Sequence, residues 1–286
     1  MLRIACSCLM LLFFSAGSLA AENAAPVKRI VALAPHITEL LFAAGAGAQV
    51  VGTVAYSDYP EAAKKIPRVG DYRSLQLENV LRLKPDLIIT WPGNALTAQL
   101  EKLAKLGLRI EYSDPKTPQD IADTIRRFGQ LSGHVNIAEQ NAAQFLNAWR
   151  ALENRYASRA PVRVFYQVWS EPLMSLNKDN MIDFGIRACG GQNIFADAPV
   201  VVPQVSVESV LRLNPQVIIS AGETADAKSM LPWRQWPSLA ANQLGQFYVI
   251  SGDDISRPVP GILVGVEKLC TYLDQAREKI SAASSR

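Results

Sequence analysis

The sequence predicts an α/β protein of two similar lobes joined by one long, rigid helix. The first observation is an internal repeat: residues 77–89 return as residues 207–219, with Glu, Val, Leu, Arg, Leu, Pro, Ile and Ile in register. The second is an apolar stripe at helical spacing over residues 136–156, a stretch without Gly or Pro. The third is the alternation of apolar strand runs with helical patterns on both sides of that stretch, which is typical of parallel sheets covered by helices.

Both copies of the repeat predict the same local structure. In each, Val and Leu mark one face of a helix, a proline ends the helix, and an apolar strand follows. The 130-residue spacing exceeds the periods of solenoid repeats, which run to roughly 50 residues, and suits a small domain. Two such Rossmann-like lobes facing each other would form a cleft.

The first lobe is expected over residues 27–134. Its opening strand, residues 29–34, precedes a helix with His36 or Thr38 near its start and Gly45 or Gly47 at its end. The remaining elements expected in this lobe are strands over residues 50–54, 87–90 and 108–112 and a helix over residues 100–106.

The joining helix is expected over residues 135–158 and the second lobe over residues 161–282. A single rigid helix between lobes restricts hinge motion, whereas several flexible linkers would allow wide closure. The elements expected in the second lobe are strands over residues 162–166, 217–220 and 247–251 and helices over residues 181–189 and 261–278.

Residues 1–20 have the pattern of a secretory signal peptide. Arg3 supplies the positive start, residues 4–14 form an apolar core, and the small residues Ser18 and Ala20 mark a cleavage site. The apolar core is shorter than the roughly 20 residues that span a membrane. A soluble, secreted protein is expected, with a net charge of +2 after cleavage, which gives no reason to expect nucleic acid or a membrane surface as a partner.

Two cysteines, Cys189 and Cys270, remain after cleavage. An even pair in an oxidising compartment favours a disulfide, and two separate buried thiols are the alternative.

Catalytic and metal-binding motifs are scarce. The chain has only two histidines, His36 and His134, and we interpret the first as an exposed capping residue and the second as a solvated loop residue. No nucleophile elbow, P-loop or His-Glu-x-x-His pattern occurs. The sequence therefore predicts neither an enzyme nor a resident metal or cofactor.

Aromatic residues follow several of the expected strands. Tyr56, Trp91 and Trp169 come directly after strand runs, and Tyr72 precedes the first repeated helix. Ligands of open α/β sheets bind beyond the carboxyl ends of the strands, so these four side chains predict a broad, flat, largely apolar ligand. Packing within each lobe is the alternative for each of them, and for Trp233 and Trp236 it fits as well.

The loop over residues 251–258 follows another strand. Its polar side chains, together with Ile255, could contact the rim of a ligand, and a solvated turn is the alternative. The residues concerned are Asp253, Asp254, Ile255, Ser256 and Arg257.

Glu78 and Glu208 occupy the same position in the two copies of the repeat. A matched acidic pair on equivalent helices suits a two-fold partner with two basic pockets. The alternative is a carboxylate that only meets the helix macrodipole in the first turn.

The chain resembles periplasmic substrate-binding proteins of the helical-backbone type (class III), which serve ABC importers of cobalamin, haem and iron–siderophores. The segment Lys84-Pro85-Asp86-Leu87-Ile88 marks the superfamily. The segments Tyr56-Ser57-Asp58-Tyr59-Pro60 and Cys189-Gly190-Gly191, with Cys270, are similar to its cobalamin branch. The similarity spans residues 29–273; its other segments are Thr38-Glu39-Leu40, Gln192-Asn193-Ile194-Phe195 and Pro203-Gln204-Val205-Ser206.

The resemblance implies roles for particular residues. Tyr56 matches a corrin-contacting tyrosine, Trp91 an aromatic at the cleft, and Asp253 and Arg257 the ends of a ligand-contacting loop. Glu78 and Glu208 match two permease-docking glutamates, and Cys189 and Cys270 match the family's disulfide. Tyr72 and Asp254 stand where a close relative has tryptophans, and Trp169 aligns only loosely.

The expected function is therefore capture of cobalamin or a related corrinoid in the interlobe cleft by a monomer, and delivery to a two-fold ABC permease in the inner membrane. The alternatives are a haem or ferric-siderophore receptor on the same fold and, more distantly, a periplasmic hydrolase that uses His36.

Overall fold

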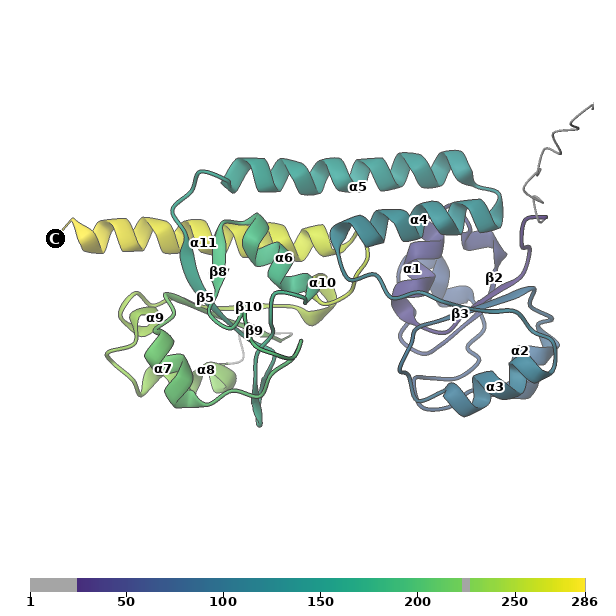
Figure 1. Cartoon of the computed structure of the whole chain (residues 1–286), viewed down its shortest axis with the longest axis horizontal. Helices are drawn as coiled ribbons and strands as arrows, with labels where there is room; N and C mark the ends of the chain where they lie inside the picture. Colours follow the sequence, from purple (N-terminus) through teal and green to yellow (C-terminus); the bar gives the residue numbers. More distant parts are fainter. Residues whose placement is uncertain (1–24, 223–226, 286) are drawn as a thin grey trace, which may run out of the picture.

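The computed structural model describes residues 25–222 and 227–285. It contains two α/β lobes, and helix α5 (Val135–Tyr156) runs along one side of both of them (Figure 1). The expected signal peptide lies outside the described residues. Within residues 25–222 and 227–285, no helix combines the length and the apolar composition needed to cross a membrane.

The N-terminal lobe is built on a parallel four-stranded sheet of order β2-β1-β3-β4. Its strands are β1 (Ile30–Ala32), β2 (Val50–Thr53), β3 (Leu87–Thr90) and β4 (Ile110–Tyr112). Its helices are α1 (Pro35–Ala43), α2 (Leu77–Arg82), α3 (Thr97–Lys105) and α4 (Pro118–Ser132), with short 3-10 turns η1 (Gly47–Gln49) and η2 (Glu61–Lys65).

The C-terminal lobe has a parallel sheet of order β10-β9-β5-β8 and a small antiparallel hairpin, β6-β7. Its strands are β5 (Val162–Gln167), β6 (Trp169–Ser170), β7 (Leu173–Met174), β8 (Gly191–Asn193), β9 (Val217–Ala221) and β10 (Phe247–Ile250). Its helices are α6 (Met181–Ala188), α7 (Val207–Leu213), α8 (Ala227–Arg234), α9 (Ala240–Gln243), α10 (Gly252–Ile255) and α11 (Ile262–Ser284).

The two parallel sheets have the same topology. In each, the first strand in the chain lies between the second and the third, and the fourth lies outside the third. The repeat forms α2 and β3 in one lobe and α7 and β9 in the other, so the prediction of two similar α/β lobes is confirmed.

The repeat also builds the same turn between helix and strand. Lys84 and Asn214, each directly before a proline, both have a φ of 45°. The guanidinium of Arg29 donates to the carbonyl oxygen of Leu83, and that of Arg163 donates to the carbonyl oxygen of Asn214. Each arginine therefore ties the opening strand of its lobe to the end of the repeated helix.

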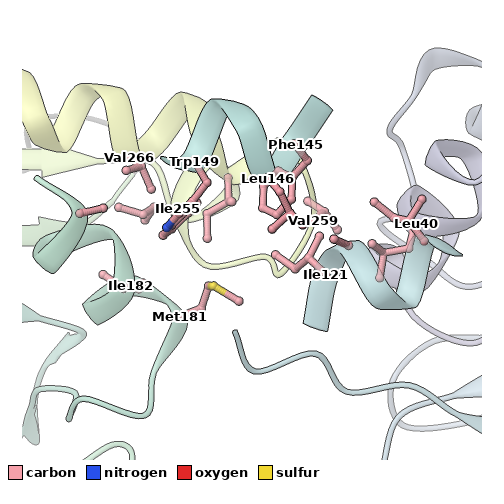
Figure 2. Packing of buried hydrophobic residues seen from close by; sticks show 14 of the residues in the cluster. Leu40, Ile121, Phe145, Leu146, Trp149, Met181, Ile182, Ile255, Val259 and Val266 are labelled. Atoms are coloured by element: carbon pink, nitrogen blue, oxygen red, sulfur yellow. The ribbon is translucent and has the colours of Figure 1, made fainter. Parts of the chain in front are cut away.

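One buried apolar cluster runs through both lobes along α5. Figure 2 shows Phe145, Leu146 and Trp149 of α5 between Leu40 and Ile121 of the N-terminal lobe and Ile182 and Val266 of the C-terminal lobe. Pulling the lobes apart would expose part of this shared core to water, which is unfavourable by roughly 25 cal/mol per Å² of apolar surface. The joining helix is therefore packed into the body of the protein.

A disulfide joins Cys189, at the end of α6, to Cys270 in α11, with the Cα atoms 4.8 Å apart. Both cysteines are buried. The expected pairing of the two cysteines is confirmed, and it fixes the C-terminal helix to its own lobe.

Candidate functional site

A cavity of about 660 Å³ lies between the two lobes. The N-terminal lobe contributes residues from α1 and from the segment after β2, and the C-terminal lobe contributes α10, the loop after it and the first turn of α11. The lining residues are Glu39, Tyr56, Asp58, Tyr59, Lys64, Asp253, Asp254, Arg257, Val259, Gly261 and Val264. Since β2 and β10 both end at this cavity, it follows the rule that open α/β sheets bind ligands beyond the carboxyl ends of their strands.

The structure brings together four of the residues predicted as ligand contacts, namely Tyr56, Asp253, Asp254 and Arg257. Tyr56 is 70 % exposed and has a φ of 66°. A left-handed backbone at a residue other than glycine costs free energy and clusters at functional sites, although Lys84 and Asn214 adopt it in structural turns. Tyr59, which sequence reasoning did not select, adds a second exposed ring to the same wall.

The other predicted contacts do not line this cavity. Tyr72 and Trp169 are largely exposed, and Trp91 is half-buried against the shared core. Ile255 is fully buried in that core, and the hydroxyl of Ser256 donates to the carbonyl oxygen of Gly252.

Ion pairs fix the polar side chains of the C-terminal wall. Asp254 pairs with Lys268 of α11 at 2.6 Å. The guanidinium of Arg257 pairs with Asp253 at 2.7 Å and, across the cavity, with Glu39 of the N-terminal lobe at 2.9 Å. The sequence analysis missed Glu39. The available signal was a single carboxylate next to the apolar residues Leu40 and Leu41 of a helix, because a buried charge needs a partner.

The two repeated glutamates are exposed and lie in the first turns of α2 and α7. Figure 1 places these two helices on the same side of the molecule, opposite α5. Hydrogen bonds with its own backbone N–H and with Ser206 lower the pKa of the Glu208 carboxyl.

Helix α1 begins at Pro35 with Ala34 as its N-cap, so the interpretation of His36 as an exposed capping residue is wrong. Proline is favoured at the first helical position because its missing N–H would have no partner there. His36 lies in the first turn and is partly buried, and burial lowers the pKa of its imidazole to about 4 against a partial opposing effect of Asp114.

The low pKa of His36 predicts a loss of stability in acid. Above pH 6.5 the imidazole of His36 is mostly neutral in both the folded and the unfolded protein. Between pH 6.5 and about pH 4 the unfolded chain binds a proton there, whereas the folded protein does not. At about 1.4 kcal/mol per pH unit, the free energy of unfolding should fall by up to ~3 kcal/mol across that range. We expect the free energy of unfolding to fall less in His36→Gln than in the unaltered protein between pH 7 and pH 4.5. Urea unfolding of both proteins at these two pH values measures the difference. An equal decline in both proteins would contradict the assignment.

A second cavity, of about 600 Å³, lies within the C-terminal lobe beside α6 and β8. It contains none of the predicted ligand contacts. Among the residues that the structure describes, no three His, Cys, Asp or Glu side chains are grouped so that they could hold a metal ion.

Comparison with known families decides which class of protein carries this cleft. The family model described as "Periplasmic binding protein" matches residues 30–253. The chain belongs to the periplasmic binding protein family. The fold of two parallel sheets joined by a long helix is thus that of a class III periplasmic binding protein, and the family consists of binding proteins rather than enzymes.

Several relatives of this periplasmic binding protein are similar over nearly their whole length. A vitamin B12-binding protein of Vibrio cholerae serotype O1 is 40 % identical over 255 residues, which cover 89 % of this chain and 92 % of the relative. One from Yersinia pestis is 38 % identical over 260 residues and covers 90 % of both chains.

Solved structures agree with this placement. The crystal structure of the periplasmic vitamin B12-binding protein of Vibrio cholerae has a TM-score of 0.78 and 40 % identity, and the match covers 88 % of this chain and 98 % of that one. The apo form of a periplasmic haem-binding protein from Roseiflexus has a TM-score of 0.74 and 25 % identity, with 87 % and 99 % covered.

Proposed function

We propose that this protein captures cobalamin or a related corrinoid in its interlobe cleft in the periplasm and delivers it to an ABC importer in the inner membrane. The observation that carries the proposal is 40 % identity with a vitamin B12-binding protein over 89 % of the chain. The cavity adds independent support, because it joins two exposed aromatic rings to a wall of charged side chains.

The chemistry of the cavity suits a corrinoid. The flat, apolar corrin ring can pack on the faces of Tyr56 and Tyr59, and its peripheral amide groups can bond to Asp253, Asp254 and Arg257. Pockets of ~300–1000 Å³ enclose drug-sized ligands, and a cobalamin is larger than these. Part of the ligand would therefore extend beyond the cavity, where Tyr72, Trp91 and Trp169 remain candidate contacts.

Isothermal titration of the mature protein with cyanocobalamin tests the proposal. We expect stoichiometric binding, and Tyr56→Ala should raise the Kd by about 10- to 100-fold because it removes an aromatic anchor from the ligand surface. Leu106→Ala is the control, since Leu106 is an exposed apolar residue of the same lobe that lies before the amino end of β4 and outside the cavity. Absence of heat with both cyanocobalamin and cobinamide, together with saturable binding of haemin, would overturn the corrinoid assignment.

Haem is the second candidate, favoured by the similarity to the haem-binding protein from Roseiflexus and by the exposed phenol of Tyr56, which could ligate haem iron. A ferric siderophore fits less well, because anionic siderophore complexes are usually held by several arginines. Arg257 is the one arginine that lines this cavity among the described residues. A haemin spectrum that shifts with the unaltered protein but not with Tyr56→Phe would identify haem as the ligand.

Delivery requires a docking surface. We assign it to the side that carries Glu78 and Glu208, because equivalent helices of two equivalent lobes present two exposed carboxylates. A permease with two-fold symmetry would meet them with two basic pockets.

A further inference from the structure

The ion pair between Glu39 and Arg257 joins the two lobes across the ligand cavity. The guanidinium Nη1 of Arg257 lies 2.9 Å from Glu39 Oε1, and its Nη2 lies 2.7 Å from Asp253 Oδ1. All three residues line the same cavity. Glu39 and Arg257 are 218 positions apart in the sequence, so the contact exists only when both lobes are in place.

The two carboxylates hold the arginine differently. The Glu39 side chain is 8 % exposed and lies in a helix whose neighbouring side chains, Ile37, Leu40 and Leu41, are buried in the core. Asp253 is 75 % exposed, and it lies in the four-residue helix α10. Glu39 is therefore the fixed partner of Arg257, whereas water can replace the exposed Asp253 carboxylate as a partner of the guanidinium.

From these contacts we propose that Glu39 is a positioning residue, which aims the Arg257 guanidinium at the ligand. The inference rests on the proposed function, since the ligand is the corrinoid bound in this cavity. The two ion pairs use two of the five N–H donors of the guanidinium. The others can bond to amide oxygens at the rim of the ligand.

Pre-positioning has a physical reason. A free arginine side chain must lose its rotamer freedom when it binds, whereas one held by Glu39 has already lost it in the free protein. Because Glu39 belongs to the opposite lobe, the same contact also fixes the distance between the two walls of the cavity. Ligand affinity should therefore depend on Glu39 through Arg257.

A double-mutant cycle measured by cyanocobalamin titration tests the inference. We expect Glu39→Gln alone to raise the Kd by about 10-fold, a coupling typical of residues in one ion-pair network. In the background of Arg257→Gln, the same change should alter the Kd by less than about twofold, because there is no guanidinium left to position. Thermal unfolding of each variant measures the separate effect on stability.

Glu139→Gln is the control, because it removes the ion pair with Arg126, which joins α5 to α4 and lies outside the cavity. It should leave the Kd unchanged. If Glu39→Gln fails to fold, Glu39→Asp, which keeps the charge on a shorter side chain, takes its place in the cycle.

The outcomes separate the two claims. If the unaltered protein binds cyanocobalamin and Glu39→Gln raises the Kd equally in both backgrounds, Glu39 has a general structural role and the inference is wrong. A lower melting temperature with an unchanged Kd overturns it as well. If the unaltered protein does not bind cyanocobalamin, the proposed function fails, and the inference fails with it.

Discussion

Replacing Trp149 by alanine is expected to lower the free energy of unfolding by about 3–5 kcal/mol, the range for truncating a buried tryptophan. Trp149 is 3 % exposed and lies in α5, where the apolar cores of the two lobes meet (Figure 2). Its ring centroid is 6.1 Å from that of Phe145, and its indole N–H donates to Glu153. The substitution therefore leaves a cavity in the core that both lobes share.

Urea unfolding followed by circular dichroism measures this effect. Trp236→Ala is the control, since Trp236 is 37 % exposed, and it should cost less than Trp149→Ala because its removal leaves no closed cavity. Because one apolar cluster spans both lobes, we also expect the unaltered protein to unfold in a single transition. Two separate transitions, or equal losses for the two tryptophans, would show that α5 does not couple the lobes.

The sequence predicted the two lobes because the repeat carries strong local signals. The proline after each repeated helix and the apolar run after each proline specify a turn and a strand without help from distant residues. Helix α5, which has 22 residues, was predicted for a similar reason, since its apolar stripe continues from Ala138 to Tyr156. Strand β8 was missed because its sequence, Gly-Gln-Asn, contains no β-branched or aromatic residue that would predict a strand.

Helix α4 was missed although its start carries a signal. Thr117 and Asp120 form a capping box, in which each side chain accepts a hydrogen bond from the backbone N–H of the other. The spacing of Thr and Asp before an apolar run would have placed this helix.

The site was predicted only in part. The rule for the carboxyl ends of parallel strands predicts that Tyr56 and the loop from Asp253 to Arg257 lie close together, and in the structure Tyr56, Asp253, Asp254 and Arg257 line one cavity. It does not say which side chains of a loop face the cavity, and Ile255 faces the core instead. The rule could not predict that Glu39 belongs to the site. Its partner Arg257 is 218 positions away, and their contact depends on the packing of the two lobes.

Reversing both repeated carboxylates, with Glu78→Arg and Glu208→Arg in one chain, should abolish import while leaving cyanocobalamin binding unchanged. Both side chains are exposed, and neither lines the cavity. Hydrogen bonds to charged groups contribute about 1.5–3 kcal/mol each. Losing two of them, with repulsion added, should weaken docking by more than about 100-fold.

Uptake of labelled cyanocobalamin measures the result, in cells that carry the importer and lack their own binding protein. The matched control, Glu267→Arg with Glu278→Arg, changes the net charge by the same amount on exposed positions of α11, away from α2 and α7 (Figure 1). Control uptake at the level of the unaltered protein would exclude a general effect of net charge. Because the glutamates occupy equivalent positions in the two lobes, each single reversal should give an intermediate loss. Normal uptake by the double variant would mean that the permease docks elsewhere.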